Sequence, residues 1–201
     1  MKIMENLLER LAEYPNSETV FNPYREPYAI DNLRHYFEYI FNQGGKRILL
    51  VGEAPGYKGC RITGIPFTSG RVFQEISHPL LISLKDKIHL PQIETERTAT
   101  IVWNYLSDKQ VTPLFWNSFP FHPYEKEKSA GNRAPTAAEV KIGAEIIIEL
   151  NHLYKPELMA GIGHKGVAAL RQIFPEKTIE YIRHPSRGGK PEFINGMNGV
   201  I

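Results

Sequence analysis

The stretch Arg47-Ile48-Leu49-Leu50-Val51-Gly52 decides the fold class of this chain. A continuous apolar run bounded by glycines is typical of a strand that is buried on both faces, as in a parallel sheet. Residues 112–119, 156–162 and 178–182 predict three further strands of similar length. We therefore expect a central four-stranded parallel sheet.

Helical segments alternate with these strands. Thr136 precedes Glu139 by three residues, which is the spacing of a capping box at a helix start. Because strands and helices alternate along the chain, we expect an α/β protein with helices on both faces of the sheet, a three-layer α/β/α sandwich. The helices are predicted around Leu7–Ala12, from Asp31 as N-cap to Phe41, and over 71–84, 94–106, 136–154 and 165–174.

Composition places the chain among ordinary globular proteins. Of its 201 residues, 42% are hydrophobic and 23% are charged, which excludes collagen-like, coiled-coil and disordered chains. No apolar run approaches the roughly 20 residues of a membrane helix, and charged residues follow Met4 directly, so we expect a cytoplasmic protein without a signal peptide. The single cysteine, Cys60, excludes an internal disulfide and a four-cysteine metal site built by this chain alone.

Positive charge is concentrated in two segments that are distant in sequence. Residues 44–71 hold five Lys or Arg against Glu53 alone, and residues 160–191 hold six against two Glu, so each has a net charge of +4. The whole chain has a net charge of only +2. If the two segments meet in space, they form one basic face suited to phosphates, and chance segregation of charge is the alternative.

Polar loops rich in proline and glycine follow three of the predicted strands, over residues 53–67, 117–133 and 184–187. Ligands of open α/β sheets bind outside the carboxyl ends of the strands. We therefore expect one site assembled from these three loops. The first of them, taken alone, is a weak signal, because it has neither a P-loop nor a dinucleotide-binding motif and a plain structural turn accounts for it.

A series of short motifs along the chain resembles the uracil-DNA glycosylase superfamily, most closely its iron–sulfur branch, over roughly residues 46–187. Residues 1–45 are then an N-terminal helical extension of a single domain spanning 1–201. Two features depart from that branch: one cysteine stands in place of four, and Gly59-Cys60 stands where a Glu-Asp pair is usual. The motifs are Gly52-Glu53-Ala54-Pro55-Gly56, Gly64-Ile65-Pro66-Phe67, Asn117, Asn132-Arg133-Ala134-Pro135-Thr136, Gly161-Ile162-Gly163 and His184-Pro185-Ser186.

The resemblance implies hydrolysis of the N-glycosidic bond of uracil, or of another deaminated or damaged base in DNA, as in base excision repair. Such an enzyme extrudes the nucleotide and stabilises the charge that develops on the leaving base. We expect DNA as the partner, no metal or other cofactor, no membrane association, and a monomer. A non-catalytic DNA- or base-binding module of the same fold and a hydrolase of free nucleosides remain open alternatives.

Four residues are the candidates for holding the base. Phe67 offers a flat face for stacking, and the Asn117 amide could pair with the O4 and N3–H edge of uracil. Gly52 and Ala54 stand in the first motif, where the glycine lets the backbone approach the ligand closely. A core phenylalanine is the alternative for Phe67, and a loop-capping residue is the alternative for Asn117.

His184 is the main catalytic candidate, and Glu53 is the second. An imidazole N–H aimed at the base O2 would stabilise the departing anion, whereas a satisfied structural histidine is the alternative. Ala54 stands where related enzymes carry a water-orienting acid, and it cannot orient water. Glu53 could supply a carboxylate from the neighbouring position.

Four residues are the candidates for binding DNA phosphates. Ser186 and the backbone amides beside it would hold one phosphate, and Arg187 could contact the backbone or enter the groove. A solvated surface arginine is the alternative for Arg187. His164 and Lys165 stand at a predicted helix start, where free N–H groups and the helix dipole favour phosphate.

Overall fold

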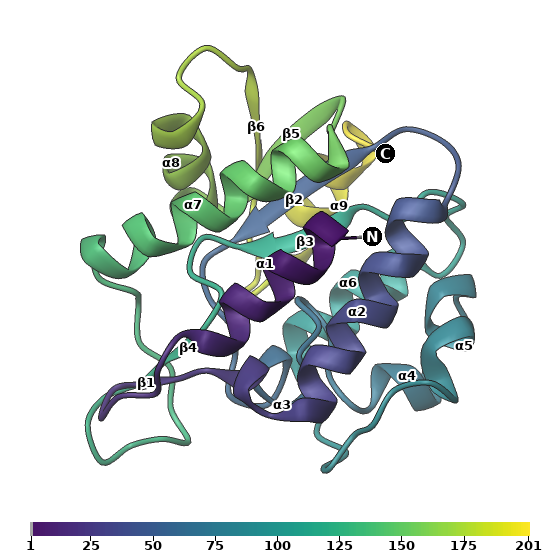
Figure 1. Ribbon diagram of the computed structural model, residues 1–201. Helices are drawn as coiled ribbons and strands as arrows, with labels where there is room; N and C mark the ends of the chain where they lie inside the picture. Colours follow the sequence, from purple (N-terminus) through teal and green to yellow (C-terminus); the bar gives the residue numbers. More distant parts are fainter. Residues whose placement is uncertain (1) are drawn as a thin grey trace.

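The parallel sheet lies at the centre of the molecule and contains β2 (Ile48–Gly52), β3 (Leu114–Asn117), β5 (Leu158–Ile162) and β6 (Ile179–Ile182). The strand order is β3-β2-β5-β6. All residues of β2 and β3 are buried, as expected for strands covered on both faces. The computed structural model, which describes residues 2–201, thus confirms the four-stranded sheet and the α/β/α sandwich (Figure 1).

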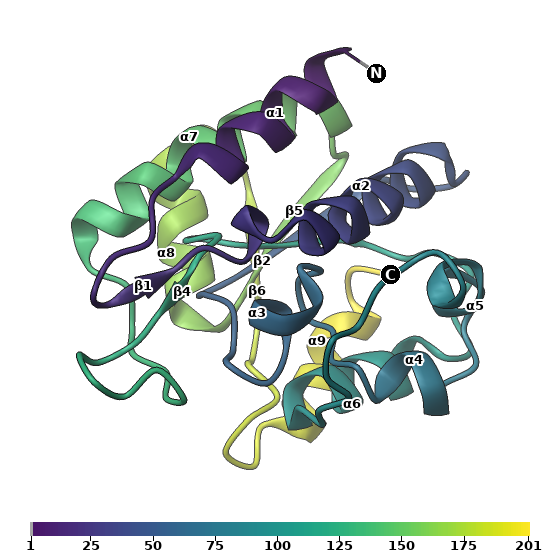
Figure 2. The same ribbon diagram turned by 60° about the horizontal axis from the view of Figure 1, so that its bottom comes forward.

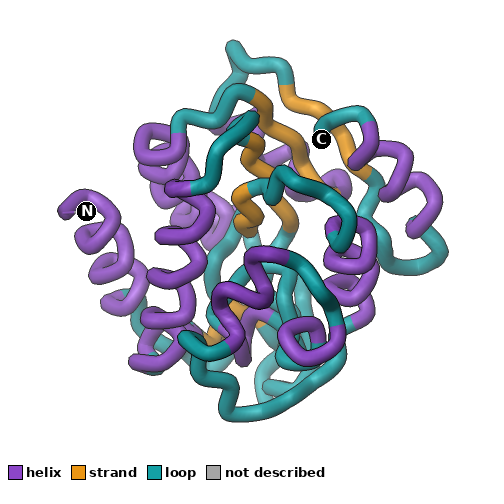
Figure 3. Tube along the Cα trace, turned by 90° about the vertical axis from the view of Figure 1, so that its right-hand side faces the viewer, coloured by secondary structure: helices purple, strands orange, loops and turns teal. Residues whose placement is uncertain are grey.

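Helices cover both faces of this sheet. Figures 1 and 2 show α1, α7 and α8 on one side, and α4, α5, α6 and α9 on the other, and Figure 3 shows the strands enclosed between them. A small antiparallel pair, β1 (Val20–Phe21) with β4 (His122–Pro123), lies outside the main sheet. The helices are α1 (Lys2–Glu13), η1 (Pro23–Arg25), α2 (Pro27–Asn42), α3 (Cys60–Thr63), α4 (Val72–Glu75), α5 (Pro79–Lys85), α6 (Arg97–Leu106), α7 (Ala137–Tyr154), α8 (Gly163–Ile173) and α9 (Lys190–Asn198).

The capping box predicted at the start of α7 is present. The Thr136 hydroxyl accepts the Glu139 N–H at 3.3 Å, and the Glu139 carboxylate accepts the Thr136 N–H at 2.7 Å. These two bonds satisfy backbone donors that a helix start leaves free. No helix among residues 2–201 is long and apolar enough to cross a membrane.

Two predicted helices differ from the observed ones. Helix α2 begins at Pro27, so Asp31 lies inside the helix and does not cap it. Proline suits the first helical position because its missing N–H would have no partner there.

The helix predicted over 71–84 is two short helices, α4 and α5. His78 before Pro79 is extended, and its ring accepts the Leu80 N–H, which starts α5 anew. Helix α9 and the β1–β4 pair were not predicted.

The two basic segments do not form one continuous face as a whole, because the start of the first segment lies apart from the rest. Lys46 and Arg47 precede β2 and therefore lie at the amino ends of the strands. There Lys46 donates to the Val200 carbonyl at 3.1 Å, and Arg47 donates to the Lys155 carbonyl at 3.0 Å. The loops expected to bind a ligand lie at the opposite, carboxyl ends. Positive charge is thus divided between the two ends of the sheet.

Glycines allow α8 to pack closely on the sheet. A Cβ at Gly166 would lie 2.0 Å from the Val51 carbonyl oxygen, and one at Gly161 would lie 2.1 Å from the Val167 nitrogen. These neighbours are backbone atoms of central elements, which cannot move without disturbing the core. The close packing of α8 against the sheet and the end of β5 therefore requires glycine at both positions.

We predict that Gly166→Ala destabilises the protein by about 1–3 kcal/mol, although alanine is intrinsically the better helix former by about 1 kcal/mol. The reason is the clash with Val51. Gly44→Ala is the control, because a Cβ at Gly44 meets nothing within 4 Å. The free energies of unfolding in urea measure both effects, and a Gly166→Ala variant as stable as the wild type would contradict the prediction.

Candidate active site

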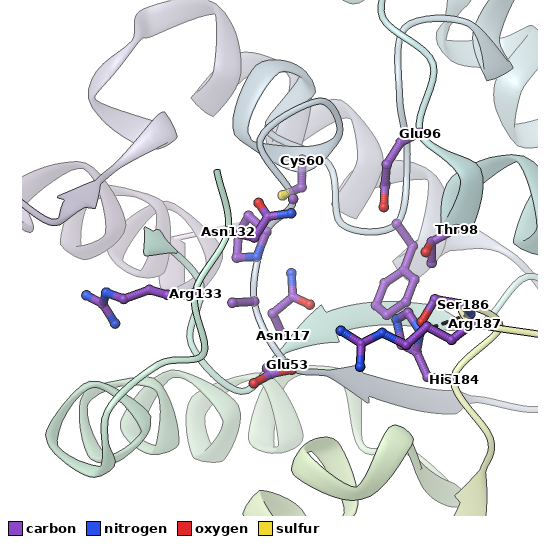
Figure 4. Close-up of a pocket in the computed structure, with 14 residues that line it drawn as sticks. Glu53, Cys60, Glu96, Thr98, Asn117, Asn132, Arg133, His184, Ser186 and Arg187 are labelled. Atoms are coloured by element: carbon purple, nitrogen blue, oxygen red, sulfur yellow. Dashed lines mark hydrogen bonds between the residues drawn. The ribbon is translucent and has the colours of Figure 1, made fainter. Parts of the chain in front are cut away.

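A pocket of about 360 Å³ opens at the carboxyl ends of β2, β3 and β6. The three loops predicted to form one site do meet there, together with the segment that starts α6 (Figure 4). The lining residues are Glu53, Ala54, Pro55, Gly56, Cys60, Phe67, Glu96, Thr98, Asn117, Asn132, Arg133, His184, Ser186 and Arg187.

Phe67 forms one wall of the pocket and is held in a demanding backbone conformation. Its φ is +58°, its carbonyl accepts the Trp103 indole N–H at 3.0 Å, and its ring packs against Phe115 at 5.2 Å between centroids. A Cβ at Gly52 would lie 2.4 Å from the Phe67 Cζ. Gly52 therefore does not line the pocket; it makes the room in which the ring lies against the end of β2.

Asn117 ends β3 and lies directly opposite Gly52 in the strand register. Its side chain is nearly buried, at 4% exposed, and lines the pocket. Among the residues that the structure describes, no hydrogen bond is made by the Asn117 side-chain amide. A loop-capping role would require such a bond, so Asn117 does not cap a loop. The amide donor and acceptor are therefore both available to a ligand.

His184 follows β6, and Ser186 fixes its orientation. The Ser186 backbone N–H donates to His184 Nδ1 at 3.2 Å, and the Ser186 hydroxyl lies 2.8 Å from the same atom (Figure 4). Since Nδ1 accepts a backbone proton, the neutral ring carries its own proton on Nε2. Burial, and secondly the positive charge of Arg183, lower the pKa of His184, which favours this neutral form.

Glu53 and Arg187 also line the pocket, from different loops. The Glu53 carbonyl accepts the Ser118 hydroxyl at 2.7 Å and the Phe119 N–H at 3.1 Å, so its backbone ties the loop after β2 to the loop after β3. Arg187 has φ of +51°, and Figure 4 shows its guanidinium extended across the pocket.

His164 and Lys165 are not brought into this pocket. Both lie in the first turn of α8, where the His164 ring stacks on Tyr181 at 4.9 Å between centroids. Lys165 lines a different cavity, the groove between α7 and α8. A phosphate-binding role for these two residues is therefore separate from the pocket that holds the other candidates.

Several lining residues were not among the predicted site residues. The Asn132 side chain accepts the Tyr57 N–H at 3.0 Å and so supports the turn after β2. Arg133 binds both carboxylate oxygens of Glu139, at 2.6 and 2.7 Å, which offsets its charge. Both residues belong to the Asn132–Thr136 motif of the sequence analysis, so the sequence did contain a signal for them.

Glu96 was also missed, and no motif marks it. It stands at the N-cap position of α6, far in sequence from any strand end. Burial raises the pKa of its carboxyl group to about 7, whereas the Thr98 side chain, as a hydrogen-bond donor, acts in the opposite direction. The indirect signal was Gly59, whose missing side chain leaves the space that this carboxyl occupies.

The pocket offers hydrogen-bond donors and acceptors around a flat wall, without a strong nucleophile. Burial raises the pKa of the Cys60 thiol to about 12, so it stays protonated at neutral pH. Across residues 2–201, no group of three or more His, Cys, Asp or Glu is arranged to hold a metal ion. The arrangement suits one planar, polar ring stacked on Phe67 and bound at its edges.

The fold and this pocket define a class of α/β proteins whose site lies at the carboxyl ends of a parallel sheet. The sequence model of the uracil DNA glycosylase superfamily matches residues 39–192, and the chain belongs to this superfamily. The crystal structure of the wild-type SMUG2 of Pedobacter heparinus is similar in fold, with a TM-score of 0.69 and 14% identity over 98% of this chain and 97% of that one. No curated protein matches the chain significantly.

We predict that His184 is neutral at pH 7, with the proton on Nε2 and none on Nδ1. The Ser186 N–H already occupies the Nδ1 lone pair, and burial disfavours the charged ring. Two-dimensional ¹H–¹⁵N correlation of the imidazole nitrogens measures this directly. A protonated Nδ1 at pH 7 would contradict the assignment, and the exposed His152 serves as the reference ring.

Proposed function

We propose that this protein is a DNA glycosylase that hydrolyses the N-glycosidic bond of uracil, or of a related deaminated base, in DNA. One observation carries the proposal. The Phe67 ring, the Asn117 amide and the oriented His184 imidazole line the same pocket of about 360 Å³. Membership of the uracil DNA glycosylase superfamily supports this type of function.

Base recognition follows from the first two groups. An extruded uracil stacks on Phe67, as flipped bases commonly do on aromatic side chains. The Asn117 amide then donates to O4 through Nδ2 and accepts the N3–H through Oδ1. Cytosine presents an amino group and an unprotonated N3 at the same edge, so both bonds would be lost. Asn117 therefore selects uracil over cytosine.

Bond cleavage depends on stabilising the leaving base. When the bond between C1′ of the sugar and N1 of uracil breaks, the electron pair stays with the base as a delocalised anion. The His184 Nε2–H donates to the base O2 as this charge develops, and it requires no charge of its own. A water oxygen then bonds to C1′, and its proton leaves to solvent or to the base.

Glu53 and Ser186 have supporting roles in this proposal. The Glu53 carboxylate, which lines the same pocket, stabilises the positive sugar from the position before Ala54. Ser186 orients the His184 ring through Nδ1 and is a positioning residue. Arg187, extended across the pocket, contacts a phosphate beside the extruded nucleotide.

A non-catalytic base-binding module is the second candidate. Ala54 favours it, because this side chain lines the pocket and cannot orient water. Cleavage of a uracil-containing oligonucleotide, in single and double strands, separates the two candidates. Binding of the same oligonucleotide with no release of uracil by the wild type would favour the module.

We predict that Asn117→Asp slows uracil removal by about 10- to 100-fold, because a carboxylate accepts at the position where O4 needs a donor. Single-turnover assays with matched uracil and cytosine oligonucleotides measure the change, and the ratio of the two rates shifts toward cytosine. The control is Asn104→Asp, which makes the same change on the exposed face of α6. An unchanged uracil rate would contradict the role of Asn117.

We predict that His184→Ala lowers the single-turnover rate by about 100- to 1,000-fold, the typical cost of losing one donor to a developing anion. DNA affinity changes much less, because the bond strengthens only as the base departs. Glu53→Gln lowers the rate by a smaller factor. His152→Ala, on an exposed position of α7, is the control. If Glu53→Gln abolishes cleavage and His184→Ala does not, the account of leaving-group stabilisation is wrong.

A further inference from the structure

Glu96 brings a second carboxyl group to the pocket, from an element that no motif marks. Its side chain lies over the turn that follows β2: a Cβ at Gly59 would lie 2.5 Å from Oε2, and one at Gly56 would lie 3.5 Å from Oε1. Figure 4 shows the Glu96 carboxyl turned into the pocket, on the opposite side from Glu53. The missing side chain of Gly59 therefore creates the space for this group, whereas a Cβ at Gly56 would be in ordinary contact with it.

The surroundings of Glu96 favour its neutral form. None of the salt bridges among the described residues includes it, whereas Glu94, two residues earlier, pairs with Lys58 at 3.5 Å. The neighbouring Cys60 is only 3% exposed, so little solvent reaches this side of the pocket. In keeping with this, burial raises the Glu96 pKa to about 7.

The position of Glu96 suits contact with the base better than contact with water at the sugar. An extruded nucleotide enters with its base innermost, while the sugar and phosphates stay on the open side, where the exposed Arg187 lines the pocket. In the proposed complex, Asn117 binds the N3–O4 edge of the base, and His184 binds O2. The C5 side of the ring and the second lone pair of O4 then face the remaining wall, which carries Glu96.

We propose that Glu96 is a specificity-determining residue of this pocket, whose protonated carboxyl donates a hydrogen bond to O4 of the extruded base on the C5 side. The proposal rests on the glycosylase function proposed above. A protonated acid and the Asn117 amide together give O4 two donors, one for each lone pair. As the base departs, its negative charge spreads onto O4, so an ionised Glu96 would repel it and slow cleavage.

The raised pKa of Glu96 is caused by burial, with the Thr98 side chain acting in the opposite direction, and not by the charged groups nearby. The buried Cys60 thiol stays neutral in the working range, and the Lys58–Glu94 pair is internally balanced. The titratable and charged residues that surround Glu96 or share its pocket are Glu53, Lys58, Cys60, Arg61, Glu94, Arg97, Arg133, His184 and Arg187.

The test compares Glu96→Gln with the wild type in single-turnover uracil cleavage from pH 6 to 8.5. We expect the wild-type rate to fall by about 20- to 30-fold over this range, because only the protonated acid donates and its pKa is about 7. Glu96→Gln keeps an N–H donor at every pH, so its rate stays flat. Glu96→Leu, which has no donor, is slower than Glu96→Gln by about 10-fold at pH 6.

The control is Glu94→Gln, which removes the same charge from the same segment and keeps the pH dependence of the wild type. A wild-type rate that is flat or rises with pH overturns the proposal, and so does a fall that persists in Glu96→Gln. A rise that Glu96→Gln abolishes would make Glu96 a general base acting on water, which also contradicts it.

Binding separates failure of this proposal from failure of the glycosylase function. The probe is an oligonucleotide with 2′-fluoro-2′-deoxyuridine, whose glycosidic bond resists cleavage, compared with the same strand carrying 2′-fluoro-2′-deoxycytidine, which has an amino group in place of O4. If the wild type cleaves no base, we still expect the binding preference of the wild-type protein for the fluorinated uracil strand to weaken above pH 7. The preference of Glu96→Gln for that strand stays constant with pH. The absence of that difference overturns the role of Glu96 in either case.

Discussion

The site depends on the absence of a side chain at Gly52. This residue ends the buried strand β2, and the strand register places it beside Asn117. Because a Cβ there would lie 2.4 Å from the Phe67 ring and 3.1 Å from the Asn117 Oδ1, any other residue would move both groups. The flat wall and the base-reading amide are therefore held in one fixed relation by the sheet itself.

Burial acts in the same direction on three ionisable groups at this pocket. It lowers the pKa of His184 and raises those of Glu96 and Cys60, so that each favours its neutral form. Neutral donors suit the chemistry proposed here, because the group that departs carries a negative charge. A Cβ at Gly59 would lie 2.5 Å from the Glu96 carboxyl, so this neutral group lies directly over the turn that follows β2.

Local sequence predicted most of the regular elements, and it failed where neighbouring residues changed the local rule. The apolar runs identified all four strands of the sheet, and Thr136 with Glu139 identified the start of α7. Helical periodicity over 71–84 concealed a break, because Pro79 forces His78 into an extended conformation. Charge clustering in sequence did not predict a basic face, because Lys46 and Lys165 lie outside the pocket.

The sequence by itself determined the fold class and the three loops that form the pocket, because each signal is local: a strand, its end and the residues that follow. Only the tertiary structure decided that Glu96 enters the pocket, that Lys165 does not, and that the Asn117 amide has no hydrogen-bond partner within residues 2–201. Four helices lie in the connection between β2 and β3. No local sequence pattern predicts where the side chains of this connection lie in the folded protein. Their positions result from packing between distant segments, such as Trp103 holding the backbone of Phe67.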